Sequence, residues 1–330
     1  MSFSHEPVLL AQVRSFLALP TARRFIDGTV GGGGHAAAVL EAVPGSELLG
    51  LDRDKEALAA AAERLASFGS RVHLVHSRFS GMAQAAAELG WDRADGILLD
   101  LGISSHQIDT PERGFAHRQD GPLDMRMDRR ERVTAATILN EANEHELARI
   151  LREYGEEPQA WRIAREIVTR RRSRPWERTW ELAELIESVV GKPFQRGLPA
   201  ATRCFQALRI AVNDELGELA QGLEAAVPLL RPGGRMAVIS FHSLEDRLVK
   251  NFFRDEARNC VCPPKLPVCV CDHRARLRIL TRKPLRADQA ELSINRRAAP
   301  AHLRVAERVE SKRTGSPAVA AGLGQSLSLL

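Results

Sequence analysis

The stretch RFIDGTVGGGGHAAAVLEAVPGSELLGLD, residues 24–52, decides the fold of this chain. It predicts a buried strand, a turn of four glycines, a helix and a second strand, in that order. Glycines let the backbone take positive φ and come close to a ligand. Asp52 ends the second strand about twenty residues beyond the glycines, where a carboxylate can accept hydrogen bonds from a ribose diol. This unit therefore predicts a site for a cofactor that contains a nucleoside.

Strands and helices continue to alternate up to about residue 105. The pattern predicts helices over 54–68 and 81–89 and strands over 71–76 and 95–101. Such alternation is typical of an α/β fold with a doubly wound, mostly parallel sheet. Ligands of these folds bind beyond the carboxyl ends of the strands, which is where the glycines, Asp52, Phe79 and Asp100 all fall.

The alternation stops after this region, which predicts a second unit. Helical periodicity without intervening strands follows over 144–154, 159–172 and 180–190. We interpret 106–205 as an inserted helical substrate-recognition domain, between the two parts of the sheet domain, 1–105 and 206–309. The later part is expected to hold a long helix over 205–230 and strands over 235–241, 277–281 and 301–307. Serine, glycine and alanine predict a disordered tail over 310–330.

Composition limits the classes of function. With 330 residues, the chain can bury an α/β core and still carry a second lobe. It has no run of eighteen apolar residues, and its first residues are polar, so we expect a cytoplasmic protein without a membrane partner. A net charge of +5 permits a nucleic-acid partner without requiring one.

An arginine cluster in the insert has two interpretations. Arg170, Arg171, Arg172, Arg174 and Arg178 lie close to Trp176 and Trp180. They could grip phosphates and stack on bases. They could equally be a solvated helix end beside tryptophans of the core.

A cysteine cluster also leaves two interpretations open. Four of the five cysteines are Cys260, Cys262, Cys269 and Cys271, with His273 nearby. These residue types suit a tetrahedral zinc site. The alternative is reduced thiols in a loop stiffened by prolines, and Cys204 stands apart as a residue of the core.

The glycine turn alone does not identify the cofactor. Gly31, Gly33 and Ala36 fit the dinucleotide pattern of an NAD(P)-dependent oxidoreductase. Against that alternative, the strand ending in Leu98-Leu-Asp-Leu-Gly lies where methyltransferases hold cofactor and substrate. A third hypothesis, a non-catalytic RNA-binding assembly factor, is weakened because the glycines and both strand-end acids are intact.

Eight segments in order carry a resemblance to one family. They are His5-Glu-Pro-Val-Leu, Asp27-Gly-Thr-Val-Gly-Gly-Gly-Gly-His, Leu51-Asp-Arg-Asp, Leu98-Leu-Asp-Leu-Gly-Ile-Ser-Ser, Arg113-Gly-Phe, Asp120-Gly-Pro-Leu-Asp-Met-Arg-Met, Phe205-Gln-Ala-Leu-Arg-Ile-Ala-Val-Asn-Asp-Glu and Ser240-Phe-His-Ser-Leu-Glu-Asp. Together they resemble the bacterial 16S rRNA (cytosine-N4) methyltransferases over residues 5–309. The resemblance implies a Rossmann-like class I methyltransferase fold. It also implies S-adenosyl-L-methionine as cofactor, and methylation of N4 of one cytosine in the decoding region of the small subunit.

The resemblance also implies the residues that bind the cofactor. Gly33, Gly34 and His35 lie at its methionine and ribose end and Asp52 at the ribose hydroxyls. Phe79 lies near the adenine, and Asp100 and Gln107 complete the site. The expected partner is 16S rRNA or the small ribosomal subunit, and the oligomeric state, a homodimer included, stays open.

Catalysis needs an acceptor beside the cytosine amine, to orient it and take up positive charge. Asp100 is the first candidate. His242, at the end of the strand predicted over 235–241, is the second, although a structural hydrogen bond in a turn is an equal alternative for that side chain.

Overall fold

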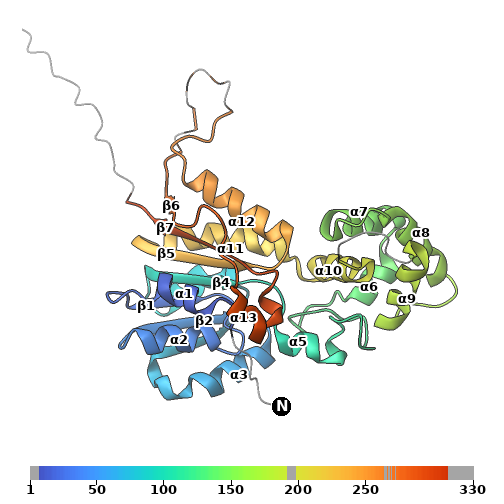
Figure 1. Cartoon of the computed structure of the whole chain (residues 1–330), viewed down its shortest axis with the longest axis horizontal. Helices are drawn as coiled ribbons and strands as arrows, with labels where there is room; N and C mark the ends of the chain where they lie inside the picture. Colours follow the sequence, from blue (N-terminus) through green and yellow to red (C-terminus); the bar gives the residue numbers. More distant parts are fainter. Residues whose placement is uncertain are drawn as a thin grey trace, which may run out of the picture.

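The computed structural model describes residues 7–191, 198–263, 266, 268, 270–271 and 273–310, and Figure 1 shows a sheet domain beside a helical lobe. Seven strands form one sheet in the order β3-β2-β1-β4-β5-β7-β6. They are β1 Arg24–Asp27, β2 Glu47–Asp52, β3 Val72–His76, β4 Ala94–Asp100, β5 Leu230–Ser240, β6 Leu277–Ile279 and β7 His302–Arg308. Strands β1 to β5 pair in parallel, and β7 runs antiparallel to β5 and β6. The predicted α/β, doubly wound and mostly parallel sheet is confirmed.

Helices cover both faces of the sheet because alternate side chains of each strand point to opposite sides. In β4, Ile97 and Leu99 pack on one face and Leu98 on the other. The first face carries α4 Met82–Glu88, α11 Glu215–Leu229 and α12 Ser243–Glu256; the second carries α1 Leu10–Leu17, α2 Gly34–Ala42 and α3 Lys55–Leu65. Figure 1 shows the two layers on either side of the strands.

The helical lobe has a hydrophobic cluster of its own. It consists of α6 Ala135–Glu141, α7 Glu144–Gly155, α8 Ala160–Arg171, α9 Thr179–Val190 and α10 Ala200–Asn213. The helix predicted over 205–230 is therefore two helices, α10 and α11. Asp214 separates them in the left-handed conformation (φ 48°), which aspartate tolerates better than most residues. Because α10 packs within the lobe, the lobe core includes Leu208 and Val212.

Four helices add to the predicted elements: α1, α6, α5 Ser105–Asp109 and α13 Gln289–Ile294. Among the described residues, none of the helices has both the length and the apolar character that a bilayer span requires. Of the tail predicted to be disordered, residues 311–330 lie outside the described residues.

Candidate active site

A cavity of about 540 Å³ lies at the carboxyl ends of β1, β2 and β4. Residues of the sheet domain line most of it, and the lobe contributes Thr202 and Arg209 from α10. The cavity brings together six of the predicted site residues: Gly34, His35, Asp52, Phe79, Asp100 and Gln107. Gly33 and His242 are not among its lining residues.

The glycine turn between β1 and α2 shapes one wall of this cavity. Gly31 and Gly33 have positive φ, 51° and 78°, which explains why glycine occupies both positions. A Cβ at Gly33 would lie 3.1 Å from Cγ of Leu65, so this residue packs α2 against α3 instead of lining the cavity.

Phe79 reaches the cavity because two glycines leave room for it. A Cβ at Gly28 would lie 2.8 Å from Cβ of Phe79, and a Cβ at Gly222 of α11 would collide with the Phe79 ring. The aromatic ring therefore lies against bare backbone and forms a flat apolar part of the wall.

Asp52 connects the end of β2 to the glycine turn. Its Oδ2 accepts a hydrogen bond from the backbone N–H of Gly31 at 2.9 Å, and its Oδ1 accepts one from Asp54 N–H at 2.9 Å. Burial raises the pKa of Asp52 to about 6 despite these two bonds. The carboxylate is thus fixed in position and faces the cavity.

The buried Asp27 and His35 and the half-buried Asp100 form a polar group beside it. Burial raises the pKa of Asp27 to about 7, although the neighbouring His35 opposes this. Nε2 of His35 lies 3.5 Å from Oδ2 of Asp100. Within the part of the chain that the structure describes, neither ring nitrogen of His35 nor Oδ1 of Asp100 has a hydrogen-bond partner. Buried polar atoms without partners in a cavity wall are suited to a polar ligand.

The turn after β4 is braced from α5. Ser104 and Gln107 form a capping box: Oε1 of Gln107 accepts from Ser104 N–H at 3.0 Å, and Oγ of Ser104 accepts from Gln107 N–H at 3.2 Å. Nε2 of Gln107 also donates to Oδ2 of Asp54 at 2.7 Å. The predicted site residue Gln107 therefore holds this turn while it lines the cavity.

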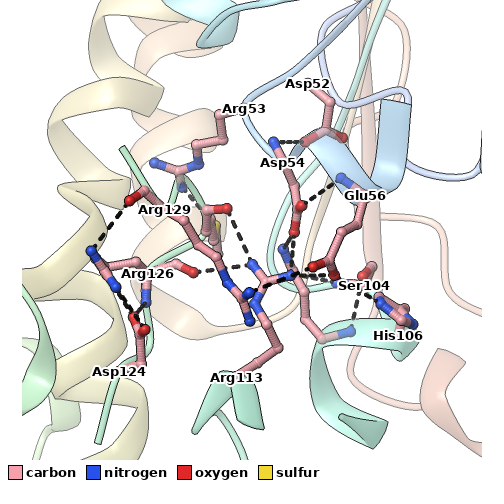
Figure 2. Close-up of polar contacts among 12 residues, drawn as sticks. Asp52, Arg53, Asp54, Glu56, Ser104, His106, Arg113, Asp124, Arg126 and Arg129 are labelled. Carbon is pink, nitrogen blue, oxygen red and sulfur yellow. Dashed lines mark hydrogen bonds and ion pairs between the residues drawn. The ribbon is translucent and has the colours of Figure 1, made fainter. Parts of the chain in front are cut away.

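Arg113 is a residue that sequence reasoning missed, although its motif was among the matching segments. Its side chain is 2% exposed and contacts Asp54 at 2.8 Å and Glu56 at 3.0 Å, at the start of α3. It also donates to the carbonyl oxygens of Arg126 and Met127. Figure 2 shows Arg113 reaching from its own segment toward Asp54 and Glu56. One arginine thus connects the sheet domain to the segment that leads into the lobe.

His242 lies behind the cavity wall, and Glu245 lies in the wall itself. His242 caps α12 through Nδ1, and its Nε2 is 3.1 Å from Oε1 of Glu245. Burial opposes ionisation of Glu245, but the hydrogen bond and charge of His242, with the charge of Arg209, hold its pKa below the usual value. Sequence reasoning missed Glu245, whose ionised carboxylate is buried beside the cavity.

The arginine cluster is largely structural. Trp176 is fully buried, Arg170 stacks 3.8 Å from its ring centroid, and Arg171 donates to two carbonyl oxygens of α6 and its end. Arg174 and Arg178 pair with acidic residues of the lobe. Arg172, Arg174 and Trp180 stay exposed, although Arg174 is also paired with Glu181, so these three are what remains of the interpretation as a nucleic-acid patch.

The cysteines are divided between two places. Cys204 is buried in the lobe core, as predicted. Cys260, Cys262 and Cys271 lie together between α12 and β6, whereas Cys269 is outside the described residues. Nε2 of His273 lies 3.0 Å from the carbonyl oxygen of Asp255.

Comparison with known proteins gives consistent matches over nearly the whole chain. A family model described as the MraW methylase family matches residues 2–309. The ribosomal RNA small subunit methyltransferase H of Heliobacterium modesticaldum is 54% identical, over 94% of this chain and 100% of the relative. The proteins of the same name from Symbiobacterium thermophilum and Geobacter sulfurreducens are 52% and 53% identical over 94% of this chain, covering 98% and 100% of the relatives.

Proposed function

This chain belongs to the MraW methylase family, and from that premise we propose that it methylates N4 of a cytosine in the decoding region of 16S rRNA, with S-adenosylmethionine as methyl donor. One observation carries the proposal. A single cavity joins the glycine turn and Asp52, suited to a nucleoside, with Asp100 and with residues of the helical lobe. A cofactor and a large substrate can therefore meet there. The oxidoreductase hypothesis does not account for the helical lobe.

The residues present fit this cofactor. The unpartnered atoms of His35 and Asp100 suit the charged amino-acid end. The Asp52 carboxylate suits the ribose diol, and the Phe79 ring offers an apolar surface to the adenine. When bound, S-adenosylmethionine supplies a methyl group made electrophilic by the sulfonium charge.

The chain's own side chains must make the cytosine amine a better nucleophile. Its lone pair is delocalised into the ring, so a carboxylate that accepts a hydrogen bond from the amine orients it and stabilises developing positive charge. We assign this role to Asp100, whose backbone N–H donates to Oγ1 of Thr29 at 2.6 Å and so fixes the strand end. Glu245 is a second acceptor in the same cavity. His242 then acts as a positioning residue for Glu245.

Substrate access requires the cytosine to leave its stack, which costs least in a single-stranded or irregular segment. The lobe, which we expect to recognise the substrate, contributes to the cavity wall from α10. We therefore expect the target to be a loop or junction of the rRNA, and the preferred substrate to be the small subunit or its rRNA.

The test measures how fast the Asp100→Asn and Asp100→Ala proteins methylate two substrates. These are 16S rRNA and small subunits, both taken from a strain that lacks this enzyme. We expect both variants to lose roughly 100-fold or more in rate, because the acceptor beside the amine is weakened or removed. Nucleoside mass spectrometry identifies the product, circular dichroism checks folding, and cofactor calorimetry separates a loss of cofactor binding from the loss of the acceptor. Full activity of a folded Asp100→Ala protein, or a methyl group on C5 instead of N4, would refute the assignment.

A further inference from the structure

The segment between α12 and β6 projects from the sheet domain, apart from the helical lobe (Figure 1). Hydrogen bonds and an ion pair hold the two ends of this segment together. The backbone N–H of Arg276 donates to the carbonyl oxygen of Glu256 at 2.8 Å, and the two side chains form an ion pair. The N–H of Ala275 donates to Oδ1 of Asn259 at 3.3 Å. The rest of the segment must be held by something else.

The large apolar side chains that the structure describes in this segment do not hold it by packing. Val261, Leu266, Val268 and Val270 are 43%, 43%, 69% and 74% exposed, so these side chains form no core. Small units that cannot build a core are commonly stabilised by disulfides or a structural metal ion.

The thiols of this segment converge. The Sγ atoms of Cys260, Cys262 and Cys271 all lie within 4.8 Å of one another, and those of Cys260 and Cys271 are 3.8 Å apart. A tetrahedral zinc with bonds of about 2.3 Å to sulfur separates its sulfur ligands by about 3.8 Å, whereas a disulfide needs about 2.05 Å. The separation therefore matches shared metal ligands and is too long for a disulfide bond.

A backbone group fixes the position of one ligand. The N–H of Val270 lies 3.5 Å from Sγ of Cys262 and donates to it. Hydrogen bonds from surrounding groups orient the ligands of metal sites in this way.

We propose that Cys260, Cys262 and Cys271 bind a zinc ion that stabilises this projecting segment. The three thiols would release three protons as they form bonds to Zn²⁺, without any change of oxidation state. A structural zinc site is tetrahedral, so a fourth donor would complete the coordination by these three cysteines. The site is separate from the cavity, none of whose lining residues is a cysteine.

The test begins with metal analysis of the full-length, untagged protein, expressed with zinc and purified without oxygen. We expect about one zinc per chain by mass spectrometry of the metal. Cys260→Ser, Cys262→Ser and Cys271→Ser should each lower the zinc content at least about tenfold. Cys204→Ser, which changes a cysteine buried in the lobe, is the matched control and should keep the metal. Cofactor binding by each variant checks that the sheet domain is folded.

A second measurement uses the unaltered chain, so that a variant that does not fold cannot decide the question. Zinc should protect Cys260, Cys262 and Cys271 from alkylation, and a chelator should remove the protection, while labelling of Cys204 stays the same. Cobalt added to the chelator-treated protein should give the charge-transfer absorption of thiolate ligands. Zinc below one tenth per chain with reduced thiols, a disulfide among these cysteines, or zinc retained by the triple serine variant would overturn the proposal.

Discussion

At the scale of single residues, Asp52 performs two tasks, since it faces the cavity and ties Gly31 into the turn. We expect Asp52→Ala to weaken binding of S-adenosylhomocysteine by about 1.5–3 kcal/mol, because charge-assisted bonds to the ribose are lost. Binding to the unaltered chain should also weaken as the pH falls through about 6, where this raised pKa protonates the carboxylate. Calorimetry measures both effects. Asp92→Ala is the control, since that side chain is 85% exposed, and equal affinity of the two variants would contradict the prediction.

Asp27 gives a prediction about stability. Burial raises its pKa to about 7 from an ordinary 3.8, so the folded chain keeps a proton that the unfolded chain releases. The free energy of unfolding therefore falls with rising pH across this window. Asp27→Asn keeps an acceptor for Thr29 and removes the charge, so it should be more stable than the unaltered chain by an amount that grows from pH 5 to pH 8, reaching on the order of 2–4 kcal/mol. Urea unfolding at both pH values measures this, and a difference independent of pH would show the prediction to be wrong.

At the scale of elements, Arg113 joins the start of α3 to the segment that enters the lobe. Arg113→Ala leaves Asp54 buried without its cation, and such a loss costs about 3–5 kcal/mol. We expect a lower unfolding midpoint and weaker methylation of rRNA. Arg118→Ala changes an exposed arginine of the same segment and serves as the control. Similar midpoints for the two variants would mean that the ion pairs of Arg113 contribute little.

At the end of α8, one arginine stabilises the fold and its neighbour is exposed. Arg171 donates at 2.8 and 2.6 Å to carbonyl oxygens, whereas Arg172 is exposed. We expect Arg172→Ala to weaken RNA binding and reduce its salt dependence by about one unit of slope, with the fold unchanged. Arg171→Ala should mainly lower the melting temperature. Binding at several salt concentrations tests this, and an unchanged slope for Arg172→Ala would remove this residue from the RNA surface.

Local patterns explain which elements could be predicted. Residues 24–52 carry strand, turn and helix signals that agree, and the observed β1, α2 and β2 follow in the predicted order. The break at Asp214 was missed because it depends on tertiary contacts: the side chain of Asn213 bonds to the backbone of Met125 and Met127, in a distant segment. The same reason explains which site residues could be predicted. Asp52 and Asp100 could be found because each ends a predicted strand. Glu245 lines the cavity and Arg113 pairs with Asp54 only because the fold brings distant segments together.

At the scale of the whole molecule, the lobe and the sheet domain have separate hydrophobic clusters. We expect S-adenosylhomocysteine to slow hydrogen exchange more in β1, β2 and β4 than in α8 and α9, because the proposed cofactor residues lie in the sheet domain. Exchange followed by mass spectrometry, with and without the compound, measures this. Equal slowing in both regions would mean that the two parts open together.

The contact of Phe79 with Gly222 also restricts how this chain can diverge over generations. A lineage that first acquired any side chain at position 222 would push the aromatic ring out of the cavity wall, and its carriers would lose fitness before a second change could compensate. A smaller residue at position 79 removes the collision in advance, but it also takes the ring out of the cavity wall at once. Each change alone therefore carries a cost, and glycine should be kept at position 222 wherever the ring is kept at position 79.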